Sequence, residues 1–243
     1  MTATPLRPLA LVGRSFRLAW EGFGLLFPLV LTPSLALSAL AYAIGPDPFM
    51  AEAQAQTGLA AFASIALELV GGPAITGVAC LAALDVALGK RHSMGEYVSQ
   101  TLRHIGPLIL LGLLLSVATT LGVAALIVPG LYIAGRFLPW TPAVVFENAG
   151  WSGLGRAQEL TEGYRWPLAG AVLAMGILCA LGFAALLPVV ALAQGSFAIA
   201  ILVDATFSTL VYLLGAAFVA AAYLRLREIR EGVGLAEVAA SLD

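Results

Sequence analysis

The sequence predicts an all-α polytopic membrane protein, a bundle of six transmembrane helices with three amphipathic helices at the membrane surface. Of the 243 residues, 60% are hydrophobic and only 11% are charged, and the mean hydropathy is +0.97. Soluble domains of ordinary composition do not approach these values. The basic residues also gather in four clusters separated by apolar stretches of membrane-spanning length. We therefore expect residues 1–243 to form a single integral membrane domain.

The first predicted elements are a surface helix and a crossing. In the segment Leu6 to Phe23, basic residues lie on one face of a helix, and large apolar residues, Phe16 and Trp20 among them, lie on the other. A basic amphipathic helix of this kind is expected to lie in the headgroup plane. A charge-free stretch over about 22–45 follows. It is longer than the apolar region of a signal peptide, roughly 7–15 residues, so we expect a retained anchor.

The second predicted span, about 67–89, belongs to an apolar segment that contains Glu68 and Asp85. These carboxylates are 17 residues apart, about 25 Å along a helix, so each is expected near one edge of a ~30 Å apolar core and neither is expected to be deeply buried. The sequence Ser93-Met94-Gly95-Glu96 has the form of a capping box and predicts a second surface helix over 93–104. A charge-free third span follows over about 105–128.

The fourth predicted span, about 130–147, is short, and Pro139 and Pro142 interrupt it. It either crosses as a bent helix or dips into the membrane and returns. Six spans place all four basic clusters on the cytoplasmic side, whereas a re-entrant segment inverts part of that pattern. The sequence thus predicts six spans, the last two at about 167–193 and 197–224, with both termini cytoplasmic and 225–243 as a short tail. The clusters are Arg7, Arg14 and Arg17; Lys90, Arg91 and Arg103; Arg156 and Arg165; and Arg225, Arg227 and Arg230.

A third surface helix is predicted over 153–163, so that a short amphipathic helix precedes each pair of spans. This order indicates a weak threefold internal repeat. The alternative is that an arginine beside an aromatic residue is common at the inner interface of any bacterial membrane protein. Both readings remain open on the sequence.

A motif surrounds the fourth span. Its residues are Pro129, Gly130, Arg136, Pro142, Glu147, Arg156, Leu160, Thr161 and Gly163. With Tyr132 and Trp166, this order resembles the YciC-like bacterial inner-membrane proteins and the membrane domain attached to some glycerophosphodiester phosphodiesterases. The resemblance covers about forty residues. It implies a multi-pass fold in the bacterial inner (cytoplasmic) membrane, and it implies no reaction.

The sequence offers no recognisable catalytic or metal-binding constellation. It contains no H-E-x-x-H, no G-x-S-x-G and no Walker loop. His92 and His104 are twelve residues apart, which is poor metal spacing. Cys80 and Cys179 lie in apolar runs, as buried thiols do. We therefore expect no enzyme, no cofactor, no metal and no nucleic-acid partner.

Charged residues inside the predicted membrane region carry the remaining functional information. Arg136 and Asp204 are expected at matching depths, about 9 and 10 Å from the outer boundary, with Glu68 at a similar level. The favoured interpretation is a buried Arg136–Asp204 ion pair, with Glu68 as the alternative partner; the other is a transport or proton-relay site.

Three functions are compatible with the sequence. The first is a non-enzymatic protein whose surface helices engage phospholipids, a membrane-protein partner or a second copy of the chain. The second is a small transporter or channel that uses Arg136 and Asp204 near the broken fourth helix. The third and least favoured is a membrane-embedded lipid enzyme.

Overall fold

The described part of the protein is entirely helical. The structure, a computed structural model, describes residues 6–44, 58–192 and 197–232, and no strand occurs in these ranges. This confirms the all-α class. The helices, with one 3-10 turn η1, are α1 (Pro8–Glu21), α2 (Phe23–Ile44), α3 (Gly58–Leu88), α4 (Met94–Arg103), α5 (Ile105–Ala125), α6 (Ile127–Arg136), α7 (Trp140–Val145), η1 (Gly150–Ser152), α8 (Gly153–Leu160), α9 (Arg165–Leu192) and α10 (Phe197–Glu231).

Five of the described helices are long and apolar enough to cross a membrane. They contain the segments Phe23–Ile44, Ala66–Leu88, Ile105–Ala125, Arg165–Ala185 and Ile201–Glu231. These segments fall on five of the six predicted spans, and the last one continues past the predicted end at 224. Their length and composition suggest association with a membrane.

The remaining predicted span, 130–147, is divided between two short helices. α6 ends at Arg136, and α7 begins at Trp140 after a turn over Phe137 to Pro139. Pro139 has no backbone N–H with which to extend α6, and Pro142 lies in the first turn of α7, where proline is tolerated. The ten residues of α6 rise only about 15 Å, half of a ~30 Å apolar core. The six-span arrangement and its sidedness therefore stay predictions.

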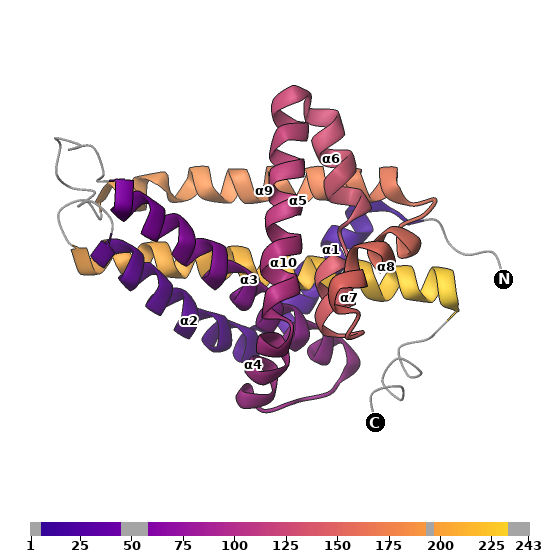
Figure 1. The fold of residues 1–243 in the computed structure, drawn as a ribbon, viewed down its shortest axis with the longest axis horizontal. Coiled ribbons are helices and arrows are strands. Elements are labelled where there is room, and N and C mark those ends of the chain that lie inside the picture. The colour runs from indigo at the N-terminus through magenta and orange to yellow at the C-terminus, as the bar shows by residue number, and fades with distance from the viewer. Residues whose placement is uncertain (1–5, 45–57, 193–196, 233–243) are drawn as a thin grey trace.

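The long helices take two directions in the molecule. In Figure 1, α2, α3, α9 and α10 run from side to side, whereas α5 and α6 run up and down as a hairpin. This hairpin is close-packed, because a Cβ atom at Gly130 would lie 2.6 Å from the backbone nitrogen of Val123. Only glycine permits that approach of two helix backbones. α1 packs against α9 and α10.

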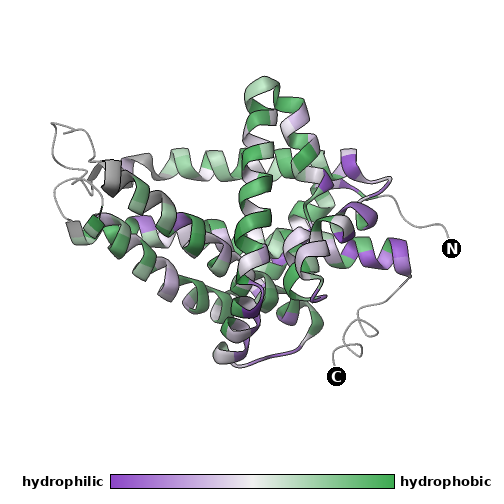
Figure 2. Cartoon of the chain, viewed as in Figure 1, coloured by the Kyte–Doolittle hydropathy of each residue, from purple (hydrophilic) through white to green (hydrophobic). Residues whose placement is uncertain are grey.

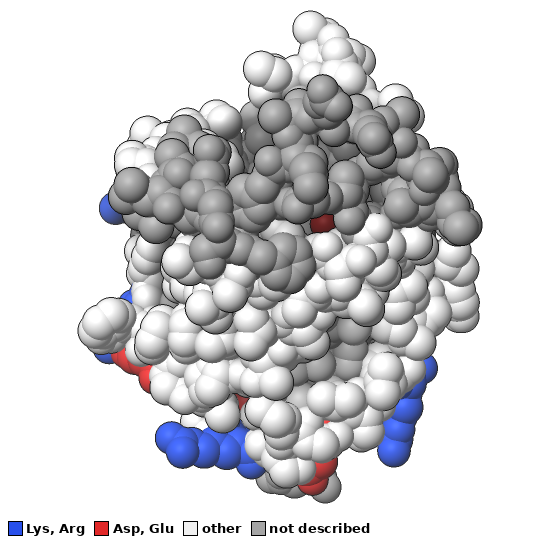
Figure 3. All heavy atoms as spheres, turned by 90° about the vertical axis from the view of Figure 1, so that its left-hand side faces the viewer, with Lys and Arg blue, Asp and Glu red and all other residues white. Residues whose placement is uncertain are grey.

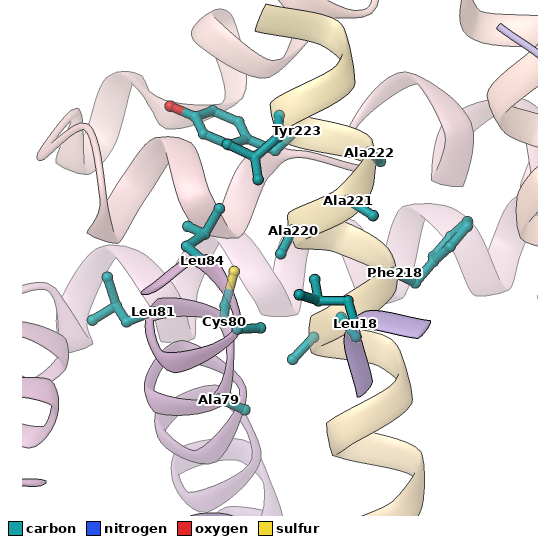
Figure 4. Packing of buried hydrophobic residues seen from close by; sticks show 14 of the residues in the cluster. Leu18, Ala79, Cys80, Leu81, Leu84, Phe218, Ala220, Ala221, Ala222 and Tyr223 are labelled. Carbon is teal, nitrogen blue, oxygen red and sulfur yellow. The ribbon is translucent and has the colours of Figure 1, made fainter. Parts of the chain in front are cut away.

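The core lies where α1, α3 and α10 meet (Figure 4). Leu18 of α1 and Leu84 of α3 are buried against a run of small residues on α10 that ends at Tyr223. Alanines let helices approach closely in an apolar environment, where packing rather than water exclusion favours association. Cys80 is a buried free thiol in this core, and Cys179 is a partly buried free thiol. The prediction of buried apolar thiols is thus confirmed for Cys80.

The structure has a short helix at each predicted surface position. α1, α4 and α8 fall within 6–23, 93–104 and 153–163. The capping box is confirmed, since the N–H of Ser93 donates to Glu96 Oε2 (2.6 Å) and the N–H of Glu96 donates to Ser93 Oγ (3.4 Å). Polar residues gather around α8 and the last turns of α10, and in the link before α4 (Figure 2). The flat placement of these helices on a leaflet and the threefold repeat stay predictions.

Candidate functional site

Most residues of the sequence motif form a corner between α6 and α8. Arg136 Nη2 donates to Gln158 Oε1 (2.6 Å), and the Arg136 carbonyl accepts a hydrogen bond from Thr161 Oγ1 (2.7 Å). Gly163 takes a φ of 81° after α8, a conformation that favours glycine. Leu160 and Pro142 are buried. We call the residues Arg136, Pro142, Glu147, Arg156, Leu160, Thr161 and Gly163 the motif corner.

Ion pairs fasten the motif corner to α10. Arg156 holds Glu147 through two hydrogen bonds, Nε to Oε2 at 2.6 Å and Nη2 to Oε1 at 3.2 Å, and it also pairs with Glu231 of α10. Tyr223 donates its hydroxyl to Glu147 Oε1 (2.7 Å), and Arg227 Nε lies 3.8 Å from the same oxygen. The hydrogen bond to Glu147 is the largest cause of the raised pKa of Arg156. These groups satisfy one another, so the corner has a structural role in this fold.

The structure does not bring Arg136 to either predicted partner. The Arg136 guanidinium lies over the ring of Phe137 and bonds to Gln158, whereas Asp204 accepts a hydrogen bond from Ser38. Among the ion pairs of the described residues, none joins Arg136 to Asp204 or Glu68. The position of a residue in a predicted span gives its depth in the membrane but not the direction of its side chain. The side chain of Arg136 is directed toward α8, where it bonds to Gln158. The predicted pair is corrected accordingly.

Asp204 and Glu68 instead share one cavity. It has a volume of about 250 Å³ and lies between α2, α3 and α10. Its lining residues are Ser34, Leu37, Ser38, Ala41, Glu68, Asp204, Ser208 and Tyr212. We call this space the acidic cavity.

Four residues that line the acidic cavity carry hydroxyl groups: Ser34, Ser38, Ser208 and Tyr212. Ser38 Oγ donates to Asp204 Oδ2 (2.7 Å), while the buried Oγ of Ser34 has no hydrogen-bond partner among the described residues. None of the lining residues is Lys, Arg or His. Carboxylate and hydroxyl oxygens are the ligands of protons and of hard cations, and the uncompensated charge favours such an occupant. The arrangement can bind and release a positive charge.

Acidic atoms are visible at one end of the bundle. Figure 3 looks along the bundle onto the end at which α2 finishes, and acidic atoms appear there in a recess. The basic atoms visible in the same view lie away from this recess, toward the edges of the molecule. Among the atoms that Figure 3 colours by residue type, the recess thus shows acidic atoms and no basic ones.

The sequence analysis missed the hydroxyl groups of this cavity. Asp204, Ser208 and Tyr212 follow one another at intervals of four residues, and Ser34 and Ser38 repeat the same interval. Four-residue spacing places side chains on one helix face. A polar stripe on an otherwise apolar span was therefore the signal that could have identified the cavity.

A second polar cluster joins the end of α3 to α4. His92 Nδ1 lies 2.5 Å from Asp85 Oδ2, and Tyr97 donates its hydroxyl to the same oxygen (2.8 Å). Asp85 is buried, contrary to the expectation that it stays near a membrane edge without deep burial. The turn at Gly89, with a φ of 70°, folds the following loop back over Asp85 and supplies these partners. Burial is the main cause that raises the pKa of Tyr97 to about 12.

The motif corner and the acidic cavity differ in the state of their charges. The arginines and glutamates of the corner pair with one another, whereas both carboxylates of the cavity line an open space without a basic residue. A ligand gains more from the second arrangement, so the acidic cavity is the stronger candidate site.

No family model, no curated protein and no solved structure matches this chain.

Proposed function

We propose that this protein is a non-enzymatic, multi-pass membrane transporter that binds a cation in the acidic cavity. The observation that carries the proposal is the placement of Asp204 and Glu68 on one cavity whose lining includes no basic residue. This proposal keeps the transporter function considered in the sequence analysis. Its site, however, is formed by Asp204 and Glu68 in place of Asp204 and Arg136. Arg136 has a structural role at the motif corner.

The position of the two carboxylates in apolar helices supports a binding role. Asp204 is partly buried and Glu68 is exposed in this chain, and acidic residues within membrane-spanning helices usually mark an ion or proton pathway. Ser38 supplies one donor to Asp204, which leaves most of the acceptor capacity of an ionised carboxylate unused. A proton or a bound cation would neutralise that charge, so occupation of the cavity is favourable.

Two of the three helices that line the cavity contain proline. α2 includes Pro28 and Pro33, and α3 includes Pro73, five residues after Glu68. Each proline removes a backbone hydrogen bond and permits a kink. α2 and α3 are each continuous, so these prolines are places at which the walls of the cavity can bend, as a transport site that opens to each side in turn requires.

The membrane assignment in this proposal comes from the basic clusters. The positive-inside rule favours six spans with both termini in the cytoplasm, and the resemblance to YciC-like proteins favours the bacterial inner membrane.

α1 adds a second, compatible function at the membrane surface. It buries Leu11, Val12 and Leu18 against the bundle but leaves Phe16 exposed and Trp20 81% exposed. A helix with an outward apolar face can engage lipid or a membrane-protein partner.

Reconstitution of the purified protein in liposomes tests the transport proposal. Proton, sodium and potassium flux should be measured separately, with a trapped pH dye for protons and radioactive tracer ions for the metals. Asp204→Asn and Glu68→Gln should reduce flux strongly. Glu159→Gln is the matched control, because Glu159 is a 72% exposed carboxylate outside the cavity. Absence of flux for every ion, or equal flux in wild type and Asp204→Asn, would reject the proposal.

A further inference from the structure

A larger groove adjoins the acidic cavity. Its volume is about 570 Å³, and its walls come from α3, α5, α6 and the start of α7. This lies within the range of small-molecule sites, roughly 300–1,000 Å³. Glu68 lines both the groove and the acidic cavity. The two spaces therefore meet at one carboxylate.

The chemistry of the groove differs from that of the acidic cavity. Glu68 is its only charged lining residue, and apolar side chains such as Ile133 and Trp140 form most of the rest. Thr76, one of its few hydroxyl residues, already donates to the carbonyl of Gly72 (2.8 Å). Such a wall suits an apolar body with few hydrogen-bonding groups.

The groove reaches the apolar outside of the protein. Leu113, one of its lining residues, is 37% exposed. Its neighbours on α5, including Leu110, Leu114 and Val117, are also exposed. In a membrane this face of α5 meets lipid. A hydrophobic ligand can thus enter the groove from the bilayer without crossing water.

We infer that the ligand is a lipophilic cation, an ammonium or other onium group attached to an apolar body. This inference rests on the proposed function and names its substrate class. The cationic group binds between Glu68 and Asp204, and the apolar body occupies the groove. An inorganic ion fills the smaller space alone and leaves the groove unused. An anionic headgroup is disfavoured, because it would lie beside two carboxylates with no basic residue on either wall.

Binding of tetraphenylphosphonium to the purified protein tests this inference. This probe has a delocalised positive charge and an apolar body but no hydrogen-bond donors. We expect saturable binding that Glu68→Gln weakens at least about tenfold, because an uncharged amide replaces the carboxylate at the junction.

A pair of substitutions at Ser116 separates the groove from the acidic cavity. Ser116 lines the groove but not the cavity and is exposed. Ser116→Phe should fill the groove and weaken probe binding, whereas Ser116→Ala should retain it. Both variants should keep the thermal stability and the inorganic-ion flux of the wild type. That result would locate the apolar body of the ligand in the groove.

The possible failures are distinguishable. If Asp204→Asn abolishes inorganic-ion flux but the probe does not bind the wild type, the lipophilic-cation inference is overturned and the transport proposal stands. Equal probe binding in Glu68→Gln and wild type, or in folded Ser116→Phe and Ser116→Ala, also overturns the inference. If neither flux nor probe binding occurs, both proposals fail.

Discussion

Replacement of Glu147 by glutamine should destabilise the protein far more than the same replacement at Glu159. Both carboxylates contact Arg156, but Glu147 is 16% exposed and accepts at 2.6 Å, whereas Glu159 is 72% exposed and lies 3.8 Å away. Glu147 also accepts a hydrogen bond from Tyr223. The same guanidinium thus provides an internal comparison of a partly buried and an exposed ion pair.

The magnitude follows from the number of bonds that the amide cannot replace. Glutamine keeps one acceptor oxygen but turns an N–H toward either Arg156 or Tyr223, so at least one charge-assisted hydrogen bond is lost. Such bonds contribute about 1.5–3 kcal/mol each. Partial exposure reduces this contribution, and we expect a loss of about 2 kcal/mol for Glu147→Gln. An exposed pair of this kind contributes roughly 0–1 kcal/mol, which is the expectation for Glu159→Gln.

Chemical or thermal unfolding of the detergent-purified protein measures this difference. Both variants should be compared with the wild type in the same detergent, at low and at high salt. Added salt should diminish the small effect of Glu159→Gln more than that of Glu147→Gln, because exposed charges are screened more strongly. Equal stability of the two variants would refute the assignment of Glu147 as the anchor of the motif corner.

Three further predictions concern other parts of the fold. Gly130→Ala should destabilise the α5–α6 hairpin by about 1–3 kcal/mol, since its Cβ atom would lie 2.6 Å from the backbone nitrogen of Val123. Gly176→Ala is the control and should be tolerated, because a Cβ atom there meets nothing within 4 Å. The unfolding midpoints of the two variants check this prediction. Arg136→Leu and Asp204→Asn should have additive effects within about 0.5 kcal/mol in a double-mutant cycle, and strong coupling would contradict their separation. The folded-state pKa of Tyr97, raised from 10.0 to about 12, gives stability that is complete below pH 10 and is lost as the pH rises toward 12. The stability difference between wild type and Tyr97→Phe should therefore shrink over that window in pH-dependent unfolding, and a constant difference would count against the raised pKa.

Features that depend on local sequence were predictable. Charge-free runs of more than twenty residues identified most of the long helices, because a span needs about 20 apolar residues. Ser93 and Glu96 identified the start of α4, since a capping box is satisfied by groups three residues apart. Short helices are also present within the three predicted surface segments. In each case the residues that determine the feature are close together in the sequence.

Features that depend on how helices rotate against one another were not predictable. Arg136 and Asp204 were expected at one depth, but α6 turns Arg136 toward Gln158 and α10 turns Asp204 toward Ser38. Asp85 became buried because the loop after α3 returns over it and brings His92 close. Hydropathy reports how far a residue lies along a helix. It does not report which neighbouring helix the side chain faces.

α10 connects the motif corner with the acidic cavity. Asp204 lies toward its start, and Tyr223 and Glu231, which contact the corner, lie toward its end. No proline interrupts α10, whereas α2 and α3, the other walls of the cavity, each contain proline. A continuous helix bends little, and kinks occur mainly at prolines and similar defects. The ion pairs of the motif corner thus hold the helix that carries Asp204, and α2 and α3 are the walls of the cavity in which proline permits a bend.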